Sequence, residues 1–506
     1  MSTNFATIKN QETLPLRDLP VLPYQEFFAT ANELLHKQGH HCVSYYAAPY
    51  GIKLKFICCI ADDYNHDIKV LSYELDSNTP HHVDSLSKDH YRMHIYEREI
   101  SENFGVEFTG HPWPKPVRYA WNRADQEKVI NNYPFYRIDG GELHEVGVGP
   151  IHAGVIEPGH FRFLCNGETV LHLEIQLGWQ HRGIEALFLE KSKLIQRTVL
   201  TESVAADTAV GHSLAFVMAM ESLGKVPVSE NLELERTIAL EVERIAMHIG
   251  DLGNVNIGMA YQLAASVFGT LRTPVINYMQ TWCGNRFGKG LNRVGGSHYP
   301  LSQELIGKLN GLLDKIDSTA RPMSDRLFSL PSFLMRSENI GTVTENQMRL
   351  IGSVGMAARA TGVPMDIRQS HPFSGYKKYT IDSQTLEQGD VWARMMLRSN
   401  EVSDSVEFVR DLARRWDSSA ASQSPTPERD LSLTPNALCV SLVEGWRGEI
   451  CHCALTDDRG AVAHYKIKDP SFHNWLALAL SLRNLEISDF PINNKSYNLS
   501  YCGFDL

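Results

Sequence analysis

The chain of 506 residues is too long for one ordinary hydrophobic core, so we expect two or more domains. Its 43% hydrophobic and 21% charged residues are typical of a water-soluble globular protein. A formal net charge of −11 argues against nucleic-acid binding, and no apolar stretch is long enough to span a bilayer. The polar first twenty residues lack a secretion signal, which predicts a cytosolic location with any membrane link made through a partner.

The cysteine and histidine patterns indicate neither a disulfide framework nor a metal site. Nine cysteines occur without a CxxC pair. The alternation in Cys451-His452-Cys453 is typical of a strand, with both sulfurs on one face and the imidazole on the other. We interpret these three as ordinary strand residues, and the histidines of "HKQGHHC" (36–42) and "TPHHVD" (79–84) as isolated surface residues.

The first predicted domain covers residues 20–120. A helical pattern at 23–39 is followed by strand-like runs at 41–51, 54–62 and 67–76, which together favour a small α+β domain. The proline-rich "GHPWPKPVRYAW" then marks a domain boundary, because prolines fix φ and remove backbone donors. We predict a linker at 121–148.

The second predicted domain covers residues 149–506 and is mainly helical with small β elements at its ends. Strand-like residues 159–178 precede helical patterns at 233–253, 302–330 and 390–416. A Ser/Pro-rich break at 417–437 is predicted to be a flexible insertion. Strand-like residues 438–457 and 460–470 and a helix near 473–483 close the chain. The fold class is therefore α+β.

Three ordered motifs resemble one family of membrane-bound redox complexes. "YEREISENFGVEFTGHPWPKPVRY" (96–119) resembles the small hydrophilic subunit of complex I. "GPIHAGVIEPGHFRF" with "LGWQHRGIEAL" (149–187), and "EGWRGEICHCALTDDRGAVAHYKIKDPSFHNW" (444–475), resemble the large subunit shared by complex I and nickel–iron hydrogenases. Fusion of both parts is typical of the formate hydrogenlyase and hydrogenase-4 branch.

The resemblance implies particular partners and cofactors. The large subunit of such complexes packs on a small iron–sulfur subunit, in which a 4Fe-4S cluster is expected. Both lie on the peripheral arm of a membrane module with antiporter-like and anchor subunits. The chain would then sit at the cytoplasmic face of the inner membrane through its partners, and would bind no cofactor itself. No nucleic-acid partner is expected.

The nickel-binding cysteines of the hydrogenases are absent from the matching positions. Ala205 and Thr208 stand where the first pair belongs, with His212 matching the histidine that follows it. Asn498 and Tyr501 stand where the second pair belongs, and Cys502 is one residue out of register. A methyl or hydroxyl group cannot replace a soft thiolate, so we expect no nickel and no hydrogenase activity.

A quinone site of the complex I type is only partly matched. The family's tyrosine position is again Ala205, and its aspartate position, counted from His248, is Gly258. Histidine can hydrogen-bond and protonate a reduced quinone, since its pKa lies near neutrality. The residues proposed to line such a pocket are His152, His160, His212, Asn498 and Tyr501.

Charged residues of the family's interface are retained. Arg182, beside His181, matches an arginine next to the partner's iron–sulfur cluster, where a fixed cation would raise the reduction potential. Arg244 and His248 share a helix face at i,i+4. Other residues matching the metal or quinone surroundings are Arg286, Arg293, Asp366 and Arg368. For each of them a purely structural ion pair or anchor is the alternative.

Two functions follow from the resemblance. The first is electron transfer at the interface with an iron–sulfur subunit, with a quinone as one acceptor, coupled to ion movement in membrane subunits. The second is a non-catalytic scaffold that docks an iron–sulfur subunit onto an ion-translocating membrane arm. A true hydrogenase is the third interpretation and has the least support in the sequence.

Overall fold

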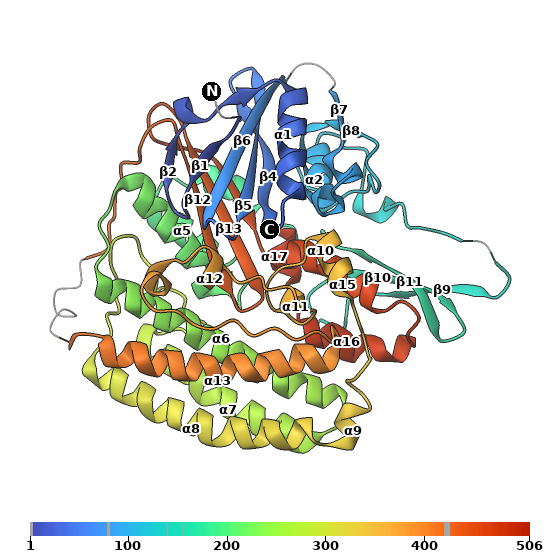
Figure 1. Ribbon diagram of the computed structural model, residues 1–506, viewed down its shortest axis with the longest axis vertical. Coiled ribbons are helices and arrows are strands. Elements are labelled where there is room, and N and C mark those ends of the chain that lie inside the picture. Colours follow the sequence, from blue (N-terminus) through green and yellow to red (C-terminus); the bar gives the residue numbers. More distant parts are fainter. Residues whose placement is uncertain (1–3, 78–80, 139, 155, 419–425) are drawn as a thin grey trace.

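The computed structural model describes residues 4–77, 81–138, 140–154, 156–418 and 426–506. Its N-terminal domain is built on a sheet in the order β1-β6-β5-β4, with β3 added in parallel to β6. The strands are β1 (Ala6–Ile8), β3 (Val21–Leu22), β4 (His40–Tyr50), β5 (Lys53–Asp62) and β6 (Asp67–Asp76). Helix α1 (Tyr24–His36) packs on β4 and β6, and α2 (His94–Phe104) packs on β4 (Figure 1).

Alternate side chains of β5 enter two different hydrophobic cores, because successive strand residues point to opposite faces. Phe56, Cys58 and Ile60 lie in the core that contains Phe27 of α1. Ile57 and its alternate neighbours lie in the core that contains the C-terminal sheet. The N-terminal sheet is therefore covered on both faces.

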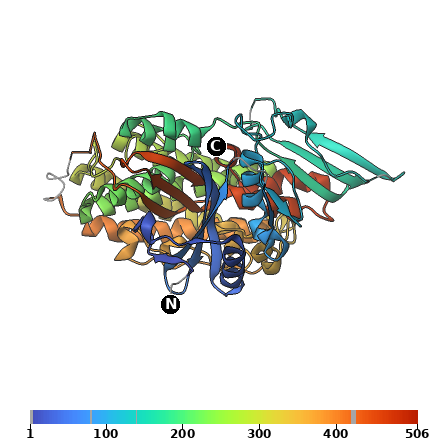
Figure 2. The ribbon, with the colours of Figure 1, turned by 90° about the horizontal axis from the view of Figure 1, so that it is seen from above.

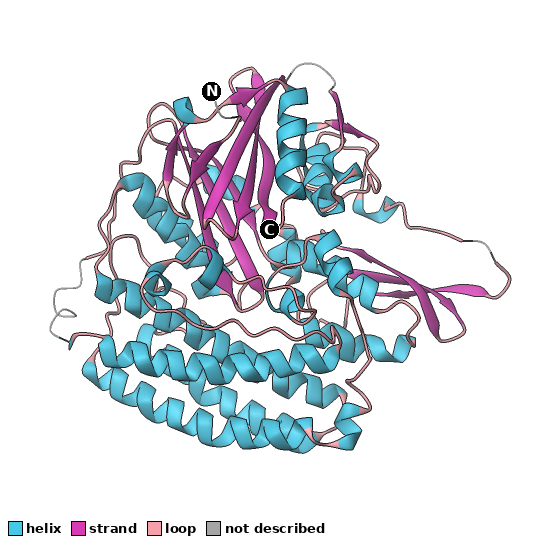
Figure 3. Cartoon of the chain, viewed as in Figure 1, coloured by secondary structure: helices cyan, strands magenta, loops and turns pink. Residues whose placement is uncertain are grey.

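The C-terminal sheet has the order β14-β13-β12-β2. Its strands are β12 (Ala437–Gly445), β13 (Gly448–Thr456), β14 (Val462–Lys468) and, from the start of the chain, β2 (Thr13–Pro15). Leu14 of β2 pairs with Leu438 of β12. The N-terminal segment thus contributes strands to both sheets, and Figure 3 shows the two sheets side by side above the helices.

Long helices form the layer beneath the sheets (Figure 3). They are α5 (Ala209–Gly224), α6 (Glu230–Gly258), α7 (Gln262–Cys283), α8 (Gln303–Phe328) and α13 (Val391–Arg415). Helix α6 contacts α5, α7, α13 and the C-terminal helix α16, so it is buried on almost every side. Because α6 also carries ionisable residues, the fold places charged side chains in its interior, where each needs a partner.

A third, smaller sheet projects from the body beside the C-terminal helices, as Figure 2 shows. It consists of β9 (Leu143–Val148), β10 (His160–Asn166) and β11 (Thr169–Gln176) in the order β11-β10-β9. Strands β7 (His82–Asp84) and β8 (Glu107–Thr109) form a separate parallel pair in the N-terminal domain.

The chain ends inside the body rather than on a free tail. Helices α15 (Ser471–Ser481), α16 (Phe490–Tyr497) and α17 (Tyr501–Asp505) pack together, and the Leu506 carbonyl accepts hydrogen bonds from the Arg182 and Gly183 amides. The remaining α-helices among the described residues are α3 (Ile184–Glu190), α4 (Leu194–Thr201), α9 (Pro331–Leu334), α10 (Glu345–Ile351), α11 (Gly355–Arg359) and α12 (Ile367–Ser370). Single 3₁₀ turns lie at Leu16–Asp18, Leu86–Lys88, Tyr91–Met93, Ile130–Asn132, Ser374–Lys377 and Ile487–Asp489.

The predicted α+β class is confirmed, with a strand-rich N-terminal domain followed by a helical region and late strands. Cys451 and Cys453 share one strand face with their sulfurs 3.8 Å apart, and His452 points the other way, as predicted. Of the predicted insertion at 417–437, residues 419–425 lie outside the described residues, and Thr434 beyond them donates to the Leu223 carbonyl of α5. Among the described helices, none combines the length and apolar composition needed to cross a bilayer.

The prediction that the histidines of "HKQGHHC" lie on the surface is wrong for His40 and His41. Both are buried at the start of β4. His40 Nε2 lies 3.4 Å from Asp62, and His41 lies between Asp63 and Glu449 at 3.3 and 2.7 Å. The physical reason is that carboxylates lie close to both imidazoles, which offsets the cost of burying them.

Candidate functional site

Thr208 and Asn498, two positions expected to have lost metal ligands, meet at one arginine. Thr208 is the N-cap residue of α5 and Asn498 the C-cap residue of α16. Arg447, which is buried, donates to Thr208 Oγ1 at 3.2 Å and to the Asn498 carbonyl at 2.5 Å. Its guanidinium also forms a two-pronged ion pair with Asp207, both distances being 2.7 Å, and stacks on Trp446.

This arrangement does not fit a nickel–iron centre. A guanidinium occupies the space between the two segments, and cations do not ligate metals. The side chains at the four ligand positions offer a methyl, a hydroxyl, an amide and a phenol instead of thiolates. Among the described residues, no group of three or more His, Cys, Asp or Glu side chains is placed to hold a metal ion.

Arg182, at the protein surface, forms hydrogen bonds to both of these segments, close to Thr208 in one and to Asn498 in the other. Its guanidinium donates to the carbonyls of Ser203, Val204 and Cys502 at 2.5, 2.9 and 2.9 Å. The residue is exposed and forms no ion pair with any carboxylate in the described parts of the chain. Next to it, His181 Nδ1 contacts the Asp505 carbonyl at 2.7 Å, and burial lowers the pKa of this imidazole. The arginine therefore presents an unneutralised positive charge at the surface.

Tyr501 and the loop between β9 and β10 form a second, adjoining group. The Tyr501 ring lies edge-on to Trp475, and a Cβ atom at Gly159 would come within 2.7 Å of it. Burial raises the pKa of Tyr501 to about 12, so the phenol stays protonated at neutral pH. His152 Nε2 lies 2.9 Å from the Gly159 carbonyl, whereas the buried Nδ1 of His160 has no hydrogen-bond partner in the described structure.

His212 belongs to a closed hydrogen-bonded row rather than to a pocket. Its Nε2 lies 3.1 Å from Asp469 and its Nδ1 lies 3.0 Å from His452 Nε2. His452 Nδ1 in turn lies 2.8 Å from the Tyr465 hydroxyl. All four side chains are buried, and both nitrogens of His212 are used within the protein. His212 therefore has no free donor or acceptor for a quinone.

Arg244, His248, Asp366 and Arg368 come together in one ionic cluster in the protein interior. Glu401 of α13 is its centre, because His248 Nε2 approaches it at 2.6 Å and Arg359 forms a close ion pair with it. Arg368 pairs with Asp366 at 2.6 Å and with Glu241 at 3.3 Å. The members of this buried cluster are Glu241, Arg244, His248, Arg359, Asp366, Arg368, Glu401 and Glu444.

A polar row connects this cluster to the C-terminal segment. His248 Nδ1 lies 3.1 Å from Arg398, which forms a 2.7 Å ion pair with Asp251. The Asn498 amide donates to Asp251 at 2.6 Å. Burial raises the pKa of Asp251 to about 6 against the opposing effect of Arg398. Residues that the sequence proposed for separate roles are thus physically linked through Arg398 and Asp251, which it did not single out.

Two regions of the chain match models of known protein families. Residues 26–123 match the family described as the 30 Kd subunit of respiratory-chain NADH dehydrogenase, and residues 264–505 match its 49 Kd subunit. One chain therefore contains regions similar to both families. The carbon monoxide-induced hydrogenase of Rhodospirillum rubrum is 28% identical over 69% of this chain and 95% of its own length. Formate hydrogenlyase subunit 5 of Escherichia coli is 26% identical over 78% and 72%, and NADH-quinone oxidoreductase subunit 4 of Thermus thermophilus is 24% identical over 69% and 90%.

The chain is thus similar to subunits of complex I and of related hydrogenases. Its 49 Kd-type region contains the cluster residues Asp366 and Arg368, and Arg447 with Asn498. Arg286 and Arg293 also lie there, but they are separate from the cluster. Arg286 is exposed over the Phe287 ring, and Arg293 pairs with Glu202 at 2.7 Å.

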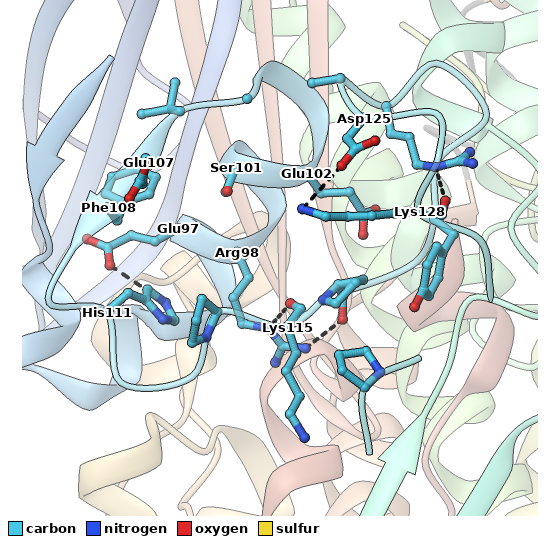
Figure 4. Close-up of a pocket in the computed structure, with 18 of the residues that line it drawn as sticks. Glu97, Arg98, Ser101, Glu102, Glu107, Phe108, His111, Lys115, Asp125 and Lys128 are labelled. Carbon is cyan, nitrogen blue, oxygen red and sulfur yellow. Dashed lines mark hydrogen bonds and ion pairs between the residues drawn. The ribbon is translucent and has the colours of Figure 1, made fainter. Parts of the chain in front are cut away.

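A large cavity in the 30 Kd-type domain does not involve the predicted site residues. Its volume is about 1000 Å³, and it lies between α2, β8 and the connection that follows them. Figure 4 shows its lining side chains interacting among themselves. Arg98 donates to the carbonyls of Lys115 and Pro116, and Lys128 faces Asp125. With these polar groups already satisfied, we do not place the functional site in this cavity.

The most informative residues missed in the sequence are the partners of the retained cations. Glu401, Arg398 and Asp251 lie on helices whose polar residues look surface-like in a sequence, since ionisable side chains are mostly exposed. The available signal was that α6 is apolar around most of its circumference, which indicates a helix buried on all sides. Charges on such a helix require partners from neighbouring elements.

Proposed function

We propose that this chain is the peripheral-arm subunit of a membrane-associated complex in which electrons pass across its interface with an iron–sulfur subunit. In this proposal the 4Fe-4S cluster belongs to the partner, and the chain itself carries no redox cofactor. The electron acceptor is a quinone or another small oxidant, and antiporter-like and anchor subunits hold the assembly at the cytoplasmic face of the inner membrane. Nickel–iron hydrogenase chemistry is not part of it.

The exposed, unpaired guanidinium of Arg182 carries this proposal. An arginine that is fixed by three carbonyls and yet forms no ion pair with a carboxylate among the described residues leaves its charge available to a neighbouring molecule. A positive charge beside an iron–sulfur cluster stabilises the reduced, more negative state and so raises the reduction potential. Arg182 also contacts residues 203–204 and 502, which belong to the segments where the related hydrogenases are expected to hold their metal.

The surface next to Arg182 has the character of a protein interface. Trp121, 65% exposed, lies against Gly183, and α3 and α4 expose Leu189, Ile195 and Val199. Exposed apolar side chains around a fixed arginine are typical of interface centres, where aromatic and arginine residues are enriched. This supports a partner subunit seated over α3, α4 and Arg182.

Replacing Arg182 tests the proposal in the assembled complex. Arg182→Gln removes the charge, whereas Arg182→Lys keeps it and loses the forked hydrogen bonds. We expect the cluster nearest this chain to titrate at a lower potential in R182Q and close to the wild-type potential in R182K. The measurement is a redox titration of the purified complex followed by electron paramagnetic resonance.

The second function, a non-catalytic scaffold, makes a different prediction for the same variants. If R182Q abolishes co-purification of the iron–sulfur subunit, while complexes that do form keep an unchanged cluster potential, the scaffold explanation is correct. The scaffold function is supported by the hydrogen bonds through which the same guanidinium holds residues 203–204 and 502 together. Stoichiometric nickel in the purified complex would contradict both functions.

A further inference from the structure

A cavity at the seam between the N-terminal domain and the helical region is large enough for a small organic ligand. Its volume is about 400 Å³, which is in the range of small-molecule sites, and such sites often lie between domains. Part of its lining comes from the α1–β4 connection and from Arg92 of the N-terminal domain. Another part comes from α10, the residues that follow it, and His473 of α15. A ligand held here would contact both halves of the chain.

Arg92 brings an unneutralised positive charge to this cavity. Its half-buried guanidinium donates to the carbonyls of Leu35 and His40, the second at 3.1 Å, and these bonds fix its position. It forms no ion pair with a carboxylate in the described parts of the chain. Burial lowers its pKa, and the like charge of Arg349 adds to this effect. Two carbonyls use only two of the five N–H groups of a guanidinium, so donors and charge remain for an anion.

The carboxylates in the lining do not supply the missing counter-charge, because both already have partners. Asp63 faces two histidines, with His41 at 3.3 Å and His371 at 3.5 Å. Glu345 pairs with Arg349 at 2.8 Å. The guanidinium described above is therefore the group whose charge a bound anion would neutralise, and burial strengthens such a pair.

His473 adds a buried hydrogen-bond acceptor to the lining. The Tyr96 hydroxyl donates to the Cys42 carbonyl at 3.0 Å, so it accepts from His473 Nε2, which is also 3.0 Å away. Burial lowers the pKa of His473 to about 3, so the ring is neutral and its Nδ1 carries a lone pair. This buried Nδ1 makes no hydrogen bond in the described structure, and the nearby Ile351 carbonyl cannot donate one. The nitrogen therefore needs an O–H or N–H group from a molecule in the cavity.

Gly352 shows that Arg92 and His473 are neighbours in the lining. A Cβ atom at this glycine would lie 2.8 Å from Arg92 Cβ and 3.7 Å from His473 Nδ1. Gly352 follows α10 with φ of 70°, a conformation that glycine adopts without strain, so the close approach is built into the end of that helix. The lining also has apolar members, which are Leu35, Cys42, Met348, Val363 and Met365. The cavity thus combines a cation, an acceptor and apolar surface.

We propose that the seam cavity binds a small phosphate ester through its hydrogenphosphate group. Near its second pKa of about 6, such a group has anionic oxygens and a P–OH group together. The anionic oxygens accept from Arg92, the P–OH group donates to His473 Nδ1, and the organic part packs on the apolar lining. A simple carboxylate offers only acceptors and would leave Nδ1 without a partner. The inference does not rest on the electron-transfer function proposed above.

Isothermal titration calorimetry on the full-length wild-type protein at pH 6 tests the ligand class with three probes. Phenyl phosphate has the anion, the hydroxyl and an apolar body, whereas phenyl sulfate lacks the ionisable hydroxyl. We expect phenyl sulfate to bind roughly 10- to 100-fold more weakly, because it leaves a buried acceptor unpaired. Inorganic phosphate should also bind more weakly, since it lacks the apolar body. Equal affinities for the two esters would overturn the hydrogen-bond assignment, and equal affinity for inorganic phosphate would overturn the ester.

Arg92→Gln tests the position of the site, and we expect it to weaken phenyl phosphate binding by about tenfold or more. Arg286→Gln is the matched control, because it removes the same charge from an exposed arginine that does not line the cavity. It should bind as the wild type does. Hydrogen exchange of the wild type locates the site without any variant, since phenyl phosphate should protect residues 35–42 and 345–353. Unchanged affinity in R92Q, protection elsewhere only, or no binding of phenyl phosphate would overturn the proposal.

Discussion

At the scale of single residues, Asn498 holds the C-terminal segment through its backbone and its side chain together. It ends α16 with φ at 47°, a conformation that asparagine tolerates better than alanine. Its amide also donates to buried Asp251. We expect Asn498→Ala to lower the free energy of unfolding by about 2 to 3 kcal/mol, from backbone strain plus the lost hydrogen bond. Urea denaturation followed by circular dichroism measures this.

Asn484 provides the control for the backbone contribution alone. It has φ of 63° and is exposed, with no side-chain hydrogen bond in the described structure. Asn484→Ala is expected to cost only about 1 kcal/mol. Equal losses in the two variants would mean that the Asn498–Asp251 hydrogen bond contributes nothing to stability.

Glu243 makes the stability of the folded state depend on pH, and a substitution at this one residue isolates its contribution. Its buried carboxylate accepts from the Val210 and Gly211 amides at the start of α5, and burial raises its pKa to about 8. The nearby Asp207 adds to this rise and Arg244 opposes it. Because the folded pKa is above the unfolded value, the folded state loses stability as pH rises from about 4.5 to 8, by at most about 1.4 kcal/mol per unit.

Glu243→Gln removes this titration, so we expect its stability relative to wild type to increase with pH across the same range. Urea unfolding at several pH values measures the difference between the two proteins. Glu345→Gln, at an exposed residue paired with Arg349, is the control and should follow the wild-type curve. Parallel curves for E243Q and wild type would contradict the assignment.

At the scale of elements, the short strand β2 couples the two sheets. The chain adds β1 to the N-terminal sheet, crosses to pair β2 with β12, and returns to add β3. Leu14 of β2 is buried, so Leu14→Ala is expected to cost about 2 to 4 kcal/mol through lost burial and a cavity. Val21→Ala on β3, where the side chain is 49% exposed, should cost less than about 0.5 kcal/mol. Thermal unfolding compares the two, and similar losses would contradict a structural role for β2.

Elements with strong periodicity were predictable from the sequence, whereas elements defined by distant partners were not. Helices α6, α8 and α13 follow from apolar spacing, as do strands β4 to β6. Strand β2 is three residues long and exists because β12 supplies its partner. Likewise, the sequence predicts that Thr208 and Asn498 face the same site. It does not predict that Arg447, in the turn between β12 and β13, occupies the space between them. Local patterns do not encode such pairings.

At the scale of the whole molecule, the domain seam is held by charges as well as by apolar contacts. Lys466 of β14 reaches Glu99 of α2 at 2.6 Å, and Arg118 donates to the Phe504 carbonyl at 2.8 Å. These links add to the His41–Glu449 ion pair and to the core that the two sheets share. With one face of the N-terminal sheet buried only by the other domain, neither half keeps its core when the seam opens.

We therefore expect the two domains to unfold in a single cooperative transition. Native-state hydrogen exchange in increasing urea, read by mass spectrometry, reports β5 of the N-terminal domain and α7 of the helical layer separately. Both segments should approach the same opening free energy, because exposing the inner face of β5 also uncovers the C-terminal sheet. An N-terminal domain that loses protection at clearly lower urea, while α7 stays protected, would show that the sequence fuses two independently stable units.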